Sequence, residues 1–226
     1  MKIVQVISSF IMAACLTMST TVLAADASAA TAGDPQAAAT TLLRGVSDQL
    51  IARLTKDKVA IKKDTHVIIE IVDTIIMPVT DFELIAKRVL GHNWRTASVT
   101  QQQEFLKEFK LLLIVTYIAA FRSYEDQSVA FKGERADPQD PTRVEVKTLI
   151  QEPGAPPIPV NYRLHIVDGK WLVYDFNVDG VGLTSSFRSQ FDEAVRQKGM
   201  DGMLADMRKK NDEVFGKHNA NNQASN

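Results

Sequence analysis

The stretch QQQEFLKEFKLLLIVTYIAAFRSY, residues 101–124, decides the fold. Its first half is amphipathic, with apolar side chains at helical spacing at Phe105, Leu106, Phe109, Leu112 and Leu113. No charge occurs from Leu111 to Phe121, so a helix here must be covered on every side by protein, lipid or a bound ligand. This uncharged part rises only about 16 Å as a helix, which is too short for a bilayer core of about 30 Å. The sequence therefore predicts the central helix of a soluble domain, and ordinary core packing is its simplest cover.

Residues 1–25 have the features of a secretory signal peptide. A positively charged start precedes an apolar run over Ile3–Leu23, and we expect cleavage after Ala24 or Ala25. The alternatives are an uncleaved anchor, against which the alanines argue, and lipidation of Cys15, beyond which apolar sequence continues. Because Cys15 is the only cysteine, the mature chain has no disulfide and depends on its hydrophobic core, which is compatible with export to a bacterial periplasm.

The charge of the chain is close to neutral. The formal net charge is −1, and removal of Lys2 makes it −2, because Lys2 is the only charged residue before Asp26. A near-neutral chain without a dense basic run is not typical of proteins that bind nucleic acid or adhere electrostatically to anionic membranes. Any interaction with lipid is therefore expected to use apolar surface.

Helical periodicity predicts five helices besides the central one, over residues 35–56, 65–76, 80–90, 185–198 and 201–210. We expect capping boxes at the starts of the third helix and the central helix, formed by Thr80 with Glu83 and by Thr100 with Gln103. The polar residues after Asn211 are expected to fray.

Alternation of apolar and polar residues predicts four strands, over residues 129–135, 143–150, 160–167 and 170–178. Asp168-Gly169, between the last two strands, is a strong signal for a two-residue hairpin turn. The cross-strand pairs that this turn predicts are Ile166 with Trp171, Leu164 with Val173, and Tyr162 with Asp175.

Helices, then an antiparallel meander, then helices again make an α+β fold. We expect a curved antiparallel sheet of about four strands that helices wrap into a cone, which easily leaves an apolar pocket. The expected organisation is a signal peptide over 1–25, a flexible leader over 26–33, one α+β domain over 34–211 and a polar tail over 212–226.

The sequence lacks the usual signals of catalysis and metal binding. It has no glycine-rich phosphate loop and no HExxH, and its four histidines do not have the spacing of metal ligands, so we expect no metal and no cofactor. One enzymatic alternative, a dehydratase or isomerase on the same cone, would use Asp175 as a general base beside Tyr162, with Tyr117 nearby. The simpler interpretation is that Asp175 ends its strand and pairs with a neighbouring polar group.

Several stretches together follow the spacing of one known family. They are residues 88–91, residues 94–97, Gln103, Phe105, Phe109, Tyr117, and residues 169–175, 178–183, 187–191 and 199–202. The set spans roughly residues 34–211 and resembles the periplasmic phospholipid-binding component of the maintenance-of-lipid-asymmetry (Mla) pathway, also described as the toluene-tolerance auxiliary protein family.

The resemblance implies a cone related to the NTF2-like superfamily. It also implies a non-enzymatic carrier in the periplasm that holds phospholipid acyl chains in an apolar pocket and shuttles phospholipid between the outer and inner membranes. Its partners would be an outer-membrane lipoprotein–porin complex and an inner-membrane ABC transporter with a substrate-binding hexamer. We expect a diffusing carrier to be a monomer.

The apolar positions of the helices and the sheet are core by default, but their number favours a cavity. The side chains that we expect to line a lipid pocket are Val72, Ile75, Ile76, Phe82, Ile85, Phe105, Phe109, Leu112, Leu113, Thr116, Tyr117, Ala120, Val144, Val146, Tyr162, Leu164 and Val173. No run of lysine or arginine marks a phosphate site, so weak headgroup selection is expected. The remaining alternative is an adaptor whose cone is solid.

Overall fold

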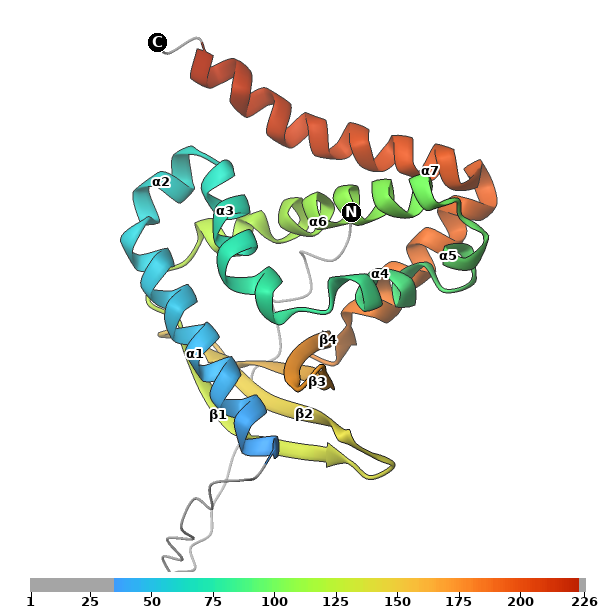
Figure 1. The fold of residues 1–226 in the computed structure, drawn as a ribbon. Coiled ribbons are helices and arrows are strands. Elements are labelled where there is room, and N and C mark those ends of the chain that lie inside the picture. The colour runs from blue at the N-terminus through green and yellow to red at the C-terminus, as the bar shows by residue number, and fades with distance from the viewer. Residues whose placement is uncertain (1–34, 224–226) are drawn as a thin grey trace, which may run out of the picture. The chain divides into compact units, whose positions relative to one another are not determined.

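The computed structural model describes residues 35–223 of the chain. The expected signal peptide and flexible leader lie outside the described residues, as do residues 224–226. Within them, the elements follow the predicted order of helices, antiparallel meander and helix (Figure 1). The predicted α+β class is confirmed.

The helices differ from prediction mainly in their boundaries. They are α1 Pro35–Lys56, α2 Lys58–Lys63, α3 His66–Ile71, the π-helical turn η1 Val72–Ile76, the 3-10 turn η2 Met77–Val79, α4 Phe82–Leu90, α5 His92–Thr96, α6 Val99–Arg122 and α7 Leu183–Gln223. The single helix predicted over 65–76 is therefore α3 followed by η1, and the short helices α2 and α5 were not predicted.

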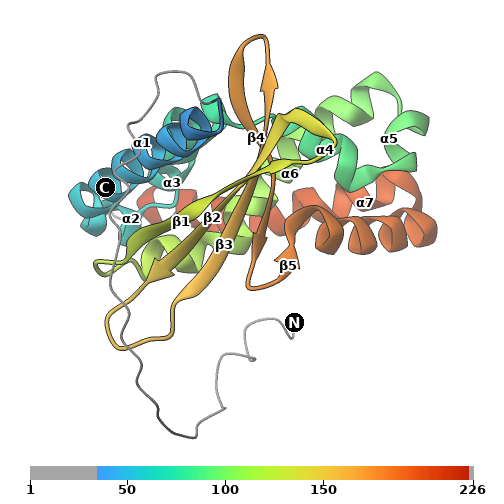
Figure 2. The ribbon, with the colours of Figure 1, turned by 90° about the horizontal axis from the view of Figure 1, so that it is seen from below.

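The strands form one open antiparallel sheet in the order β1-β2-β3-β4-β5 (Figure 2). They are β1 Ser128–Asp137, β2 Asp140–Gln151, β3 Ile158–Val167, β4 Lys170–Val178 and β5 Val181–Gly182. The sheet thus has a fifth, two-residue strand beyond the four that were predicted. Asp168 and Gly169 connect β3 to β4 with φ angles of 49° and 76°, as a two-residue hairpin turn of type I′ requires.

A β-bulge at Tyr174 changes the register within this hairpin. Near the turn, Leu164 lies opposite Val173, as predicted. Beyond the bulge, Asp175 lies opposite Arg163, so the predicted pairing of Tyr162 with Asp175 is wrong. Tyr162 instead lies opposite Phe176. Because side chains alternate between the faces of a sheet, the extra residue moves Phe176 to the face of Tyr162 and Asp175 to the other face.

Two helix caps also differ from prediction. α4 is capped by Asp81, whose Oδ1 accepts a hydrogen bond from the Leu84 amide at 3.0 Å, whereas the Thr80 hydroxyl donates to the Ile76 carbonyl in the preceding turn. α6 begins two residues earlier than expected, with a capping box formed by Ser98 and Gln101. The predicted boxes of Thr80 and Thr100 are therefore wrong.

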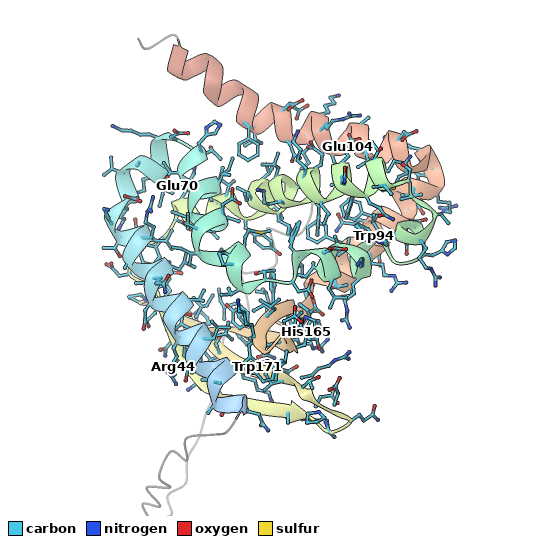
Figure 3. The ribbon with its side chains drawn as sticks, viewed as in Figure 1. Arg44, Glu70, Trp94, Glu104, His165 and Trp171 are labelled. Atoms are coloured by element: carbon cyan, nitrogen blue, oxygen red, sulfur yellow. The ribbon has the colours of Figure 1, made fainter. Side chains whose placement is uncertain are left out.

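Asp81 ties α4 to the sheet as well as capping it. Its amide donates to the Val173 carbonyl at 2.9 Å, and its Oδ2 lies 3.0 Å from Nε2 of His165, which β3 places beside the start of α4 (Figure 3). We expect Asp81→Ala to lower the free energy of unfolding by about 1–2 kcal/mol, because both side-chain contacts are lost.

Urea unfolding monitored by circular dichroism measures this effect. Asp81→Asn is the matched control, because its amide oxygen can still accept from the Leu84 amide. An alanine variant that is no less stable than the asparagine variant would show that the cap does not hold α4.

Three clusters of buried apolar side chains join these elements. One joins α4, the first half of α6 and α7, and includes what we call the aromatic cluster: Phe82, Phe105, Phe109, Phe187 and Phe191. A second joins the end of α1, α2, α3 and the second half of α6. In the third, Ala39 and Leu43 of α1 pack on the sheet. α6 contributes to the first two clusters, as predicted for the central helix.

The last helix continues beyond the point where fraying was expected. α7 kinks at Gly199, where φ is 69°, and then runs on to Gln223. Asn211 is buried and its amide donates to both the backbone carbonyl and the carboxylate of Glu108 on α6, at 3.0 and 2.8 Å. Phe215 is buried in the second cluster. The expectation of fraying directly after Asn211 is therefore wrong, because these two residues anchor the helix on α6.

Candidate functional site

One face of the central helix α6 is largely left uncovered by the buried clusters, of which the first reaches only Leu113 on this face. Thr116, Tyr117 and Ala120 are exposed and Leu113 is half-buried, although all four lie in the uncharged half of α6. They are related by three or four residues and therefore lie on one face of the helix. We call these four residues the open stripe.

The open stripe faces the sheet. Glu108 bonds to α7, and Tyr117 is nine residues further on, which is about two and a half helical turns and thus the opposite side of α6. The ring of Tyr117 lies 6.4 Å from that of Phe176 on β4, and Phe176 lies 6.4 Å from Tyr162 on β3. These three rings connect the helix to the same face of the sheet on which α1 packs.

The structure distributes the other predicted pocket residues among the buried clusters. Ile85, Phe105, Phe109 and Leu112 are buried in the first cluster, with Phe82 packed against it. Val72 is buried in the second, with Ile75 and Ile76 packed against it. Val144, Val146, Leu164 and Val173 are buried in the third, with Tyr162 packed against it. The predicted set is therefore not one continuous wall, and exposed surface is concentrated in the open stripe.

Phe176 was missed by the sequence analysis. The regular hairpin that Asp168-Gly169 predicts would place this side chain on the outer face, and the bulge at Tyr174 brings it to the inner face beside Tyr162. No signal in the sequence marks the bulge itself.

Partial desolvation of the phenols by the surrounding side chains raises the pKa of Tyr117 and Tyr162 above their ordinary value of about 10. In the unfolded chain each phenol loses its proton near pH 10, whereas in the folded chain it keeps the proton to higher pH. The unfolded state therefore binds fewer protons in this range, so the tyrosines make stability fall as the pH rises above about 10.

We expect Tyr162→Phe to lose less stability than the wild-type chain between pH 9 and pH 11, because one of these phenols is removed. Urea unfolding at both pH values measures the difference, and the same comparison between pH 7 and pH 9 serves as the control, where the two proteins should change alike. If both proteins lost the same free energy of unfolding between pH 9 and pH 11, the raised pKa of Tyr162 would be contradicted.

The pair proposed for the enzymatic alternative is not brought together. Asp175 lies on the sheet face opposite to Tyr162, where its Oδ1 accepts hydrogen bonds from the Phe176 amide at 3.0 Å and the Thr184 hydroxyl at 2.8 Å. Its Oδ2 lies 3.4 Å from a guanidinium nitrogen of Arg163. Asp175 thus links the end of β4 to the start of α7, which agrees with the simpler structural interpretation.

No helix between residues 35 and 223 combines the length and the apolar character needed to cross a membrane. Over the same described range, no three histidine, cysteine, aspartate or glutamate side chains gather in a way that could hold a metal ion.

Comparison with known proteins gives three kinds of match. The chain matches the MlaC protein family over residues 44–209. Toluene tolerance protein ttg2D of Pseudomonas putida is 27% identical over 161 residues, which cover 71% of this chain and 74% of that protein. The intermembrane phospholipid transport system binding protein MlaC of Haemophilus influenzae is 24% identical over 169 residues, which cover 74% and 78%. A solved structure of the phospholipid-binding protein from Ralstonia solanacearum, in complex with a phospholipid, has a TM-score of 0.72 and 28% identity, covering 80% of this chain and 99% of that one.

Proposed function

Because this chain belongs to the MlaC protein family, we propose that it is a periplasmic carrier that binds phospholipid by its acyl chains and moves it between the outer and inner membranes. The observation that carries the proposal is the open stripe, an exposed and uncharged face of the central helix that is turned toward the sheet. Membership of the family confirms the resemblance inferred from the sequence motifs, and the relatives' names describe phospholipid binding and transport.

The physical requirement of such a carrier is apolar surface that replaces water around hydrocarbon. Moving an acyl chain of about 15 methylenes into water costs about 12 kcal/mol, at about 0.8 kcal/mol for each methylene. The uncharged side chains between α6 and the sheet would supply the surface that replaces water around the acyl chains. The acyl chains would lie against Leu113, Thr116, Tyr117 and Ala120 on one side and Tyr162 and Phe176 on the other.

The remaining predicted residues would support this site from behind. The aromatic cluster fixes the first half of α6, and the side chains under α1 fix the curvature of β2, β3 and β4. The phosphate headgroup would stay outside, because a buried phosphate without a charged partner would be strongly unfavourable. The open stripe contains no lysine or arginine, which supports weak selection among headgroups.

The proposed partners follow from transport between two membranes. We expect an outer-membrane lipoprotein–porin complex on one side and an inner-membrane ABC transporter with a substrate-binding hexamer on the other. The carrier would act as a monomer, without a cofactor and without catalysing a reaction.

Mass spectrometry of protein purified from its own cells without detergent tests the proposal. We expect phospholipid in amounts comparable to the protein, with mixed headgroups. Protein that is folded but carries no phospholipid, in preparations where no step strips lipid, would overturn the proposal and favour an adaptor with a solid interior.

A further inference from the structure

The outer face of the sheet carries a second recessed site, which the acyl-chain site does not use. It is a cleft of about 440 Å³ between α4, the end of the β1–β2 hairpin and the middle of the sheet. Its charged and aromatic lining is Arg88, Arg135, Asp137, Arg143, Glu145, Arg163 and Tyr174. We call it the arginine cleft.

The strand register assembles this cleft from residues that are far apart in the sequence. Arg135 on β1 lies opposite Glu145 on β2, which lies opposite Arg163 on β3. The three residues therefore form a row across the face opposite to Tyr162 and Leu164. Arg143 lies two residues before Glu145 on the same face, and α4 adds Arg88 from above Tyr174.

Two of the four arginines are already paired. Arg163 lies 3.6 Å from the carboxylate of Glu145 and 3.4 Å from that of Asp175. Arg143 lies 3.0 Å from the carboxylate of Asp140. These pairs use carboxylates that lie in or beside the cleft.

The other two arginines are available to bind an acidic ligand. Arg88 stacks over the ring of the buried Tyr174, with the guanidinium carbon 4.6 Å from the ring centre. Arg135 is exposed. Among the described residues, neither guanidinium has a carboxylate within 4.0 Å. Asp140, Glu145 and Asp175 thus offset the charges of Arg143 and Arg163, and the positive charge of the cleft that has no carboxylate partner within the described part of the chain lies at Arg88 and Arg135.

We propose that the arginine cleft docks an acidic segment of a partner protein, one of whose carboxylates is held between Arg88 and Arg135. This inference rests on the proposed function, since a carrier must meet a donor and an acceptor of lipid. A guanidinium binds a carboxylate through two parallel hydrogen bonds, and Arg88 is already oriented by its contact with Tyr174. Arginine and tyrosine, together with tryptophan, are also enriched among the residues that dominate binding energy in protein interfaces.

The same features favour a protein segment over a bilayer surface. Asp137 and Glu145 lie in the lining beside the arginines and would repel a continuous layer of phosphates, whereas a segment with both carboxylates and a basic residue can match the alternating charges. The near-neutral chain also has little long-range attraction for an anionic membrane.

The test compares binding to two preparations. One is envelope membrane vesicles from the cells that make the protein, and the other is protein-free liposomes made from the lipids of those vesicles. We expect the purified, lipid-loaded chain to bind the vesicles and not the liposomes, and expect high salt to weaken binding. The single variant Arg135→Glu should weaken binding to the vesicles by at least about tenfold, and so should the double variant that carries both Arg88→Glu and Arg135→Glu. Lys209→Glu, which makes the same charge change at an exposed position on α7, should bind like wild type.

Two controls separate this inference from the proposed function. Thermal unfolding reports whether each variant is folded, and Arg135→Glu tests the cleft even if the double variant fails to fold, because Arg135 is exposed. Co-purified phospholipid should be unchanged in Arg135→Glu, so that loss of docking is measured with lipid binding intact. Wild-type binding by Arg135→Glu, equal binding of the wild type to liposomes, or no binding of the wild type to the vesicles would each overturn the proposal.

Discussion

Replacing Ala120 with tryptophan is expected to lower the affinity of the protein for phospholipid by at least about tenfold. Ala120 is exposed at the end of the open stripe, where an indole would occupy space that we assign to an acyl chain. Each methylene that is displaced into water costs about 0.8 kcal/mol, so the loss of two is already more than tenfold in affinity. Competition with a fluorescent phospholipid gives the affinity, and mass spectrometry gives the lipid retained after purification.

Ala119→Trp is the matched control for this variant. Ala119 is also exposed, but it lies about 100° further round the helix and outside the open stripe. The two variants add the same side chain to neighbouring positions of α6, so effects on helix propensity and solubility should be alike. Equal phospholipid affinity of the two variants would contradict the placement of the acyl chains against the stripe.

Truncating Phe109 to alanine is expected to cause the largest loss of stability, about 3–5 kcal/mol. Phe109 is fully buried at the centre of the aromatic cluster, with its ring centre 5.2 Å from Phe105, 5.4 Å from Phe187, and 5.6 Å from Phe82. The substitution leaves a cavity where α4, α6 and α7 meet. Because the free energy of unfolding of a typical domain is only about 5–15 kcal/mol, the substitution is expected to remove a large part of the total stability.

Urea unfolding followed by circular dichroism measures this loss. Val99→Ala is the control, since Val99 is 69% exposed at the first turn of the same helix, and its change should stay within about 0.5 kcal/mol. A loss below about 1 kcal/mol for Phe109→Ala would mean that the aromatic cluster does not form the principal core.

The sequence was sufficient for the fold class, because its strongest local signals agree with the tertiary structure. The uncharged helical stretch became the central helix α6, and the turn signal at Asp168-Gly169 set the hairpin of β3 and β4. The same kind of signal at Asp179-Gly180, with φ angles of 51° and 81°, leads into β5 and could have predicted that strand.

The predictions of helix ends were wrong where a contact with a residue distant in the sequence decides between two locally plausible conformations. Thr80 and Asp81 are both good caps, and the contacts of Asp81 with β3 and β4 select it. A polar residue such as Asn211 suggests a frayed end, but Glu108 on α6 supplies the buried partner that its amide needs. Neither partner is adjacent in the sequence, so neither choice could be made without the fold.

The candidate site was predictable to the extent that it depends on one helix. The spacing of Thr116, Tyr117 and Ala120 already places them on one face of α6. Their exposure, in contrast to the burial of Leu112 and Phe109, depends on which side α7 covers. The arginine cleft could not be predicted, because the register of β1, β2 and β3 and the position of α4 over Tyr174 bring its arginines together.

The extra residue in β4 also determines which mutations this strand can accept. Before Tyr174 the inward-facing residues of β4 have odd numbers, as in Trp171 and Val173. After Tyr174 they have even numbers, as in Phe176 and Val178. If β4 kept all its residues but paired with β3 without the bulge, every residue after Tyr174 would exchange sides, which would turn the carboxylate of Asp175 toward α6 and the ring of Phe176 toward water. The bulge therefore decides which side chains at the end of β4 face α6, and a change that abolishes it without removing a residue would invert that end of the strand.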